Sequence, residues 1–444
     1  MPDMLCAVTV ETPPAPPLRR NSAYVLLTTG RFAQAIGAGV GTFAIPLLAF
    51  EVTGSVGQAG LISGLGQVGA LLATLPAGVV ADRVNRRALL LVAAATGTAL
   101  WATVVAAGLA GGLSAWHLAA VLFGSSAVSA FVNPASGGAL RAVVPAAQMP
   151  NAMAVNQGRM AAVALFAGPV GGFLYGMAHV LPFVGSVVGH AVELVAVAFV
   201  RRPLNEVRTE PTHPLDDLRE GLRFVGRVPL FRAVLVLITL LNLTSIALVV
   251  AINLELVRTG TDPRLIGLVD ACAGISMLAG AIVAGPIVRH TRVGRFGVLT
   301  VGVLAGALAV MALAPTYWVF VAMLALGVFL YPALNAGFTG YLTVIVPDRM
   351  MGRATSLLGL TGLVAAPAAP VLGSALLEGW GIGATLWVMV GAMVVLLVAL
   401  ALTRPLMRIG TPDTWAADAL AQGTGAQASG SAARSRGPTA RRIW

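Results

Sequence analysis

Residues 78–87 read G-V-V-A-D-R-V-N-R-R and separate two long apolar stretches, residues 57–80 and 88–110. Each stretch is long enough to cross a bilayer as an α-helix, which needs about 20 apolar residues. The charged residues between them are costly to place in the hydrocarbon core. The sequence here therefore predicts two membrane-spanning helices joined by a very short loop at the membrane surface.

The same pattern extends outward in both directions. The chain is 57% hydrophobic and only 10% charged, whereas soluble proteins carry about 25% charged residues. This composition excludes a large water-soluble enzyme and an intrinsically disordered chain. The predicted spans are residues 24–48, 57–80, 88–110, 117–140, 152–178, 181–200, 230–253, 264–288, 296–314, 317–342, 354–377 and 383–403.

The net charge of +11 is explained by membrane topology. All 28 basic residues are arginines, and cytoplasmic loops of membrane proteins carry an excess of basic residues. If both termini are cytoplasmic, every arginine except Arg31, Arg159, Arg258 and Arg264 falls on the cytoplasmic side. We therefore expect no nucleic-acid partner.

Three short motifs recur in the second half of the chain. F-V-N-P-A at 131–135 and V-V-P at 143–145 have counterparts F-L-Y-P-A at 329–333 and I-V-P at 345–347. G-P-V-G-G at 168–172 has the weaker counterpart A-P-V-L-G at 369–373. Parallel six-helix repeats are one layout of secondary transporters, with the transport pathway between the halves.

The predicted fold is an all-α membrane protein with twelve transmembrane helices in two pseudo-symmetric six-helix bundles. The linker between the bundles contains D-D-L-R-E-G-L-R-F-V at 216–225, which we expect to form an amphipathic helix along the membrane surface. The predicted parts are a cytoplasmic N-terminal tail (1–22), an N-terminal bundle (23–200), a cytoplasmic linker (201–229), a C-terminal bundle (230–405) and a cytoplasmic tail expected to be disordered (406–444).

The segment 78–87 resembles G-x-x-x-D-R-x-G-R-R, the signature between the second and third helices of the major facilitator superfamily, with Asn85 where Gly is usual. The resemblance implies a latch that holds the N-terminal half to the start of helix 11, near Gly352 and Arg353. The alternative is a solvated turn that obeys the positive-inside rule. The latch residues would be Gly78, Asp82, Arg83, Arg86 and Arg87.

Gly168, Pro169 and Gly172 resemble the G-P-x-x-G-G signature of exporters in this superfamily, with Phe173 at the last Gly position. The resemblance implies a bend and a seal between the two halves, because proline bends a helix and glycine permits close packing. A plain packing kink is the alternative.

Residues 20–405 most resemble the subgroup of bacterial drug-efflux proteins and the enterobactin exporter. This resemblance implies a multi-pass protein of the bacterial inner membrane, a monomer with both termini cytoplasmic. It also implies alternating access with a small-molecule substrate and protons as partners. The alternatives are siderophore export, small-molecule import and a non-transporting membrane scaffold.

Several polar residues lie inside the predicted spans, where they usually face a cavity or a partner. Glu193 and Asp270 are candidate proton carriers, and His190, three residues before Glu193, shares its helix face. Arg31 or Arg159 could hold an anionic part of a substrate; alternatively both extend to the membrane interface. The candidate pathway residues are Arg31, Gln34, Asn133, Arg159, His190, Glu193, Asn242, Asp270 and Asn335.

No cofactor or metal site is predicted. A G-x-x-x-x-G-K-[ST] phosphate loop is impossible because the chain has no lysine, and Cys6, Cys272 and the five histidines are scattered. The absence of these motifs predicts a non-enzymatic protein, and the resemblance implies a secondary transporter that exports small amphiphilic compounds in exchange for protons.

Overall fold

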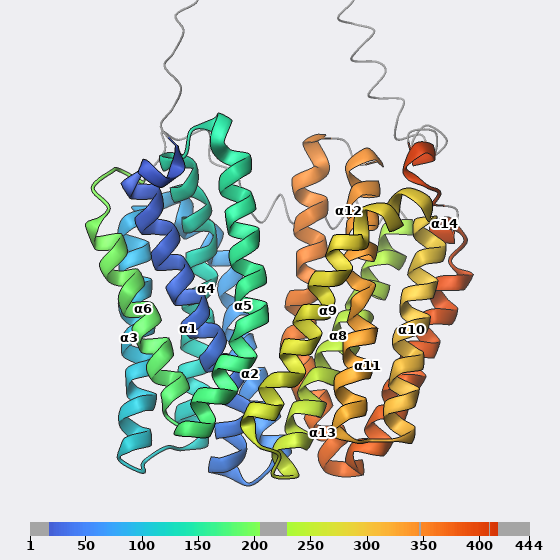
Figure 1. Ribbon diagram of the computed structural model, residues 1–444. Coiled ribbons are helices and arrows are strands. Elements are labelled where there is room, and N and C mark those ends of the chain that lie inside the picture. Colours follow the sequence, from blue (N-terminus) through green and yellow to red (C-terminus); the bar gives the residue numbers. More distant parts are fainter. Residues whose placement is uncertain (1–16, 205–228, 346–347, 408, 416–444) are drawn as a thin grey trace, which may run out of the picture.

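A computed structural model describes residues 17–204, 229–345, 348–407 and 409–415, without the side chains of a few helical residues. The predicted amphipathic helix at 216–225 and nearly all of both predicted tails lie outside the described residues. Figure 1 shows two bundles of helices side by side.

The N-terminal bundle contains six long helices. Each ends within a few residues of the next, so successive helices run in opposite directions through the bundle (Figure 1). The helices are α1 (Ser22–Thr53), α2 (Val56–Arg83), α3 (Arg86–Leu109), α4 (Ala115–Val143), α5 (Met149–Met177) and α6 (Leu181–Phe199), with short 3-10 helices at Leu18–Arg20 and Ala146–Gln148.

The C-terminal bundle has the same arrangement, except that one predicted span is divided into two helices and two predicted spans lie within one helix. Its elements are α8 (Pro229–Arg258), α9 (Pro263–His290), α10 (Val293–Leu313), α11 (Tyr317–Phe329), α12 (Tyr331–Ile345), α13 (Asp348–Leu402), α14 (Arg404–Met407) and a 3-10 helix at Pro412–Thr414. The predicted span 317–342 is divided at Leu330 because Pro332 has no backbone N–H to continue the helix.

The fifty-five residues of α13 form two crossings rather than one. Gly381 has φ 74°, a left-handed conformation that glycine adopts without steric cost. The chain reverses there, so the two parts of α13 run in opposite directions (Figure 1).

Eleven helical stretches of the described chain are long and apolar enough to cross a bilayer. The last of them, Thr361–Leu402, contains Gly381 and therefore counts as two crossings. The predicted all-α fold with twelve crossings is confirmed. Several helices extend past the predicted limits; for example, α1 ends at Thr53 instead of residue 48.

Short polar residues begin the helices and keep the connections tight. A side-chain oxygen accepts a hydrogen bond from a backbone N–H in the first turn of five helices, which satisfies a donor that has no partner within the helix. The capping residues are Asn21, Ser55, Asn85, Ser114 and Asp262.

The two bundles lie apart at the end where α1 begins and lie against each other at the opposite end (Figure 1). We call their contact the closed seam: residues 57–64 of α2 against 367–378 of α13, and residues 164–176 of α5 against 263–274 of α9. A Cβ atom on Gly60 or Gly64 would lie 2.7 Å from the carbonyl oxygen of Pro370 or Pro367. Glycine therefore lets the backbones of the two halves meet.

Glycine also sets the spacing inside the N-terminal bundle, where α1 packs along α6. We expect Gly37→Ala to lower the thermal unfolding temperature, because its Cβ would lie 2.5 Å from the carbonyl oxygen of Gly185. Such overpacking costs about 1–3 kcal/mol. Gly306→Ala in α10 is the matched control, since no atom lies within 4 Å of its added Cβ. Equal effects of the two changes would contradict this account of the α1–α6 contact.

Candidate functional site

Arg31 connects three helices inside the N-terminal bundle. Its Nη1 donates to Oε1 of Glu193 on α6 at 3.2 Å, and its Nη2 donates to Oδ1 of Asn133 on α4 at 3.4 Å. The Nη1 atom also lies 3.3 Å from Oε1 of Gln34, one turn along α1. The Glu193 side chain is 2% exposed and that of Arg31 is 16% exposed, so this ion pair is shielded from solvent.

His190 fixes the other end of the same polar cluster. Its Nδ1 donates to the carbonyl oxygen of Ser186 at 2.8 Å, because a carbonyl can only accept. The Nε2 atom of the neutral ring is then an acceptor, and Nε2 of Gln34 lies 3.5 Å from it. Gly97 of α3 leaves the space that the imidazole ring fills, since a Cβ there would overlap it.

Arg159 on α5 joins the cluster through hydrogen bonds without a carboxylate. Its Nη1 donates to the backbone carbonyl of Arg31 at 3.1 Å, and its Nη2 donates to Oδ1 of Asn156 at 2.8 Å. Among the described residues, no ion pair of Arg159 is found. The two guanidinium groups therefore share one nearby carboxylate, that of Glu193.

The cluster borders a cavity of about 310 Å³ in the half of the bundle nearer the chain termini. Residues of α1, α4 and α5 form its wall, and both guanidinium groups are part of it. The lining residues are Tyr24, Leu27, Thr28, Arg31, Asn133, Ser136, Gly137, Ala139, Leu140, Ala152, Met153, Asn156 and Arg159.

Asp270 lies far from this cluster, in the closed seam. A Cβ on Gly168 would lie 2.7 Å from Cβ of Asp270, so the carboxyl group of α9 packs directly against the glycine of α5. The side chain of Asn253 on α8 lies beside that of Asp270. Gly172 meets the backbone at Pro263, and Pro169 lies inside the continuous helix α5.

The repeated motif at 369–373 of α13 lies in the part of the closed seam where α13 contacts α2. Gly373 packs against the backbone of Ala247 on α8, while the carbonyl of Pro370 faces Gly60 of α2. The two related motifs, 168–172 and 369–373, thus both lie where the bundles touch.

The two remaining asparagines lie in the C-terminal bundle. Asn242 of α8 donates to Oγ1 of Thr361 on α13 at 3.4 Å. Asn335 borders a smaller cavity of about 130 Å³ together with Tyr331 and mostly aliphatic side chains. The described structure therefore separates Asn242, Asn335 and Asp270 from the cluster around Arg31.

The loop motif between α2 and α3 contacts its own half of the protein. Arg86 Nη1 donates to the carbonyl of Leu204 at 3.3 Å, and Arg87 Nη2 donates to that of Ala198 at 2.6 Å. Arg83 is exposed. A Cβ on Gly78 would meet no described atom within 4 Å. The halves lie apart at this end, and the side chains of Asp82 and Arg353 lie outside the described residues.

Further polar contacts, absent from the sequence-based candidates, surround the closed seam. Glu51 accepts hydrogen bonds from Tyr175 and pairs with His179, each at 2.7 Å. Ser55 of α2 donates to Glu378 of α13 at 2.6 Å, which joins the two halves.

Sequence reasoning also missed Asn156, Ser136 and Tyr24 of the cavity wall. Asn156 precedes Arg159 by three residues and Tyr24 precedes Arg31 by seven, so helical spacing placed each on the face of its arginine. That spacing was the available signal. Ser136 gave no such signal in the sequence, because a serine in an apolar helix commonly hydrogen-bonds to the backbone of its own helix.

The chain resembles known transporters over most of its length. Residues 27–254 and 235–437 match the family model described as Major Facilitator Superfamily. The multidrug efflux pump Tap of Mycolicibacterium fortuitum is 24% identical over 387 residues, which cover 82% of this chain and 92% of that protein.

Two solved structures share the fold. A bacterial homologue of the iron transporter ferroportin, in an inward-facing state, has a TM-score of 0.67 at 17% identity and covers 87% of this chain and 99% of its own. A bacterial homologue of the human lysosomal transporter Spinster, inward-facing and unoccupied, has a TM-score of 0.60 at 16% identity, over 92% and 98% of the two chains.

The buried ion pair allows a test of the cluster. We expect Arg31→Gln to destabilise the protein by about 3 kcal/mol, because it leaves the Glu193 carboxylate buried without its cation. The double variant Arg31→Gln/Glu193→Gln removes both charges and should recover much of that loss in thermal unfolding.

His179→Gln is the control for that experiment, since the side chains of His179 and its partner Glu51 are 55% and 46% exposed. Its loss should stay below about 1 kcal/mol. An equal loss in the single and double variants at Arg31 would show that the ion pair does not account for the effect.

Proposed function

This chain belongs to the Major Facilitator Superfamily, and from that premise we propose that it exports small amphiphilic compounds by alternating access, in exchange for protons. The family assignment makes it a multi-pass membrane transporter and not an enzyme. The efflux pump Tap, which covers most of the chain at 24% identity, supports export as the direction and drug-like compounds as the substrates.

The observation that carries the proposal is the polar cavity around Arg31 inside otherwise apolar helices. Ionisable groups within a membrane domain are costly and usually face a substrate pathway. The cavity of about 310 Å³ has the size of a small ligand site and combines charged groups with apolar wall residues such as Leu27 and Met153. Such a site suits an amphiphilic molecule.

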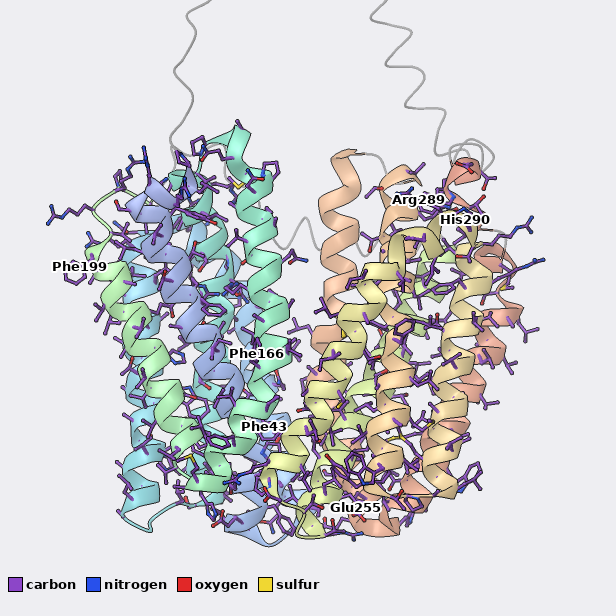
Figure 2. All side chains as sticks on the ribbon, viewed as in Figure 1. Phe43, Phe166, Phe199, Glu255, Arg289 and His290 are labelled. Carbon is purple, nitrogen blue, oxygen red and sulfur yellow. The ribbon has the colours of Figure 1, made fainter. Side chains whose placement is uncertain are left out.

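The charge distribution supports an orientation with both termini cytoplasmic. Figure 2 shows Arg289 and His290 at the end where the bundles lie apart and Glu255 at the opposite end. Basic residues favour the cytoplasmic side. With this orientation the bundles are apart on the cytoplasmic side, and the cavity is placed to load substrate from the cytoplasm of a bacterium.

Asp270 is the better candidate for the exchanged proton. The Glu193 carboxylate has a guanidinium at 3.2 Å, which stabilises its charged form. Asp270 has a neutral amide beside it and packs against a glycine in the closed seam. In the alternating cycle, we infer that separation of the seam exposes Asp270 to water and lets it exchange its proton on the far side.

Transport tests the main proposal. We expect cells that express the chain to accumulate less of at least one fluorescent dye from a panel of cationic and carboxyl-bearing dyes, and a proton uncoupler should abolish the difference. Gly137→Leu should raise accumulation to the level of cells without the protein, because Gly137 lines the cavity, a Cβ there meets no atom within 4 Å, and the larger side chain would fill part of the cavity.

Gly306→Leu is the matched control, as its glycine also has open space around it but lies in α10, away from the cavity. It should transport normally. Higher dye accumulation in expressing cells would instead indicate import, and no change with any dye would contradict the proposed substrate class.

The coupling residue has its own test in membrane vesicles. We expect Asp270→Asn to abolish dye movement driven by an imposed pH gradient while dye binding to the purified protein remains. Asp262→Asn is the control, because Asp262 is an exposed cap at the start of the same helix and asparagine also caps well. A normal gradient response in Asp270→Asn would remove this residue from the coupling mechanism.

A further inference from the structure

We propose that the cavity of the N-terminal half binds a singly charged acidic group of the transported compound, such as a carboxylate, and that Arg159 is its main partner. The inference rests on the proposed function, because it takes this cavity as the substrate site. It adds the chemical class that the site selects.

The charges of the cavity wall are unbalanced. Arg31 and Arg159 both line the cavity, and no acidic residue is among its described lining residues. Glu193 is paired with Arg31 from the adjoining helix and is itself 2% exposed, so it compensates one of the two cations. One positive charge remains, which a ligand with one negative charge would neutralise.

The unbalanced charge belongs to Arg159. A guanidinium group has five N–H donors in a planar fork. Arg159 uses one for the carbonyl of Arg31, one for the amide oxygen of Asn156 and one for a long contact of 3.9 Å with the sulfur of Met160. All three acceptors are neutral. The remaining donors suit the two oxygens of a carboxylate, which arginine binds through paired hydrogen bonds.

Two hydroxyl groups strengthen the case for an oxygen-bearing ligand. Tyr24 and Ser136 line the same cavity, and their hydroxyl groups have no hydrogen-bond partner among the described atoms although they are buried. Buried polar groups in proteins are almost always hydrogen-bonded. A hydroxyl that turns toward the cavity would find acceptor oxygens on an acidic group bound there.

The same features act against cationic compounds. A cation in the cavity would meet two guanidinium groups, and the nearby carboxylate of Glu193 is already occupied by Arg31. Like charges at short range in a medium of low dielectric constant repel strongly. Among compounds of similar size, we therefore expect the presence of an acidic group, rather than the apolar character of the compound, to decide which ones bind.

A matched pair of dyes tests the inference. Rhodamine 110 carries a free carboxyl group, and rhodamine 123 is its methyl ester with the same ring system. We expect fluorescence anisotropy with the purified full chain in phosphatidylcholine nanodiscs to show at least about tenfold tighter binding of rhodamine 110, the effect of hydrogen bonds to a charged group. Fluorescein and its methyl ester serve as a second pair.

Arg159→Gln should reduce the preference for the acid to less than about threefold, and Arg159→Lys should keep part of it. Arg141→Gln is the matched control, because Arg141 is an exposed arginine at the end of α4 that does not line the cavity. The control should keep the full preference. Unfolding temperatures of all variants separate a binding effect from a folding defect.

The outcomes also separate this inference from the proposed export function. Equal binding of acid and ester in both pairs, absence of binding included, overturns the acidic-group site even if cells expel other dyes. An unchanged preference in Arg159→Gln removes Arg159 from the site. A clear preference for the acid without any transport in cells would leave the site in place and contradict the export function.

Discussion

A guanidinium group inside a bundle of apolar helices must find its hydrogen-bond acceptors within the protein, because the bilayer core supplies none. Arg31 finds them on α1, α4 and α6, and its own backbone carbonyl accepts from Arg159 on α5. Four helices of the N-terminal bundle are thereby fixed relative to one another by one side chain and its peptide group. The cavity, the buried carboxylate and the surplus positive charge all follow from this arrangement.

The packing around that cluster relies on very small residues. Gly37 and Gly189 bring α1 and α6 together, and Gly97 makes room for His190. Helices that approach this closely can place short polar groups within hydrogen-bond distance of one another, which larger residues at the interface would prevent. The abundance of glycine in this chain is therefore part of the chemistry of the site as well as of the fold.

The sequence predicted the fold well, because long apolar stretches that recur along the chain can cross a membrane in few ways other than as α-helices. It also identified Arg31, Arg159 and Glu193 as unusual, yet it could not bring them together. Glu193 lies 162 residues from Arg31, and only the packing of α6 on α1 decides that they meet. The same limit applies to Asp270, whose partner surface on α5 is a glycine and has no side chain to signal a contact.

Gly381 has a mechanical consequence for the C-terminal half. A single left-handed residue joins the last two crossings, so the connection between them is very short. Neither crossing can shift or tilt far without moving the other. The first of these crossings also holds α2 of the other half through Ser374 and Pro370. Any rotation that pulls this contact apart must therefore move the last two crossings together.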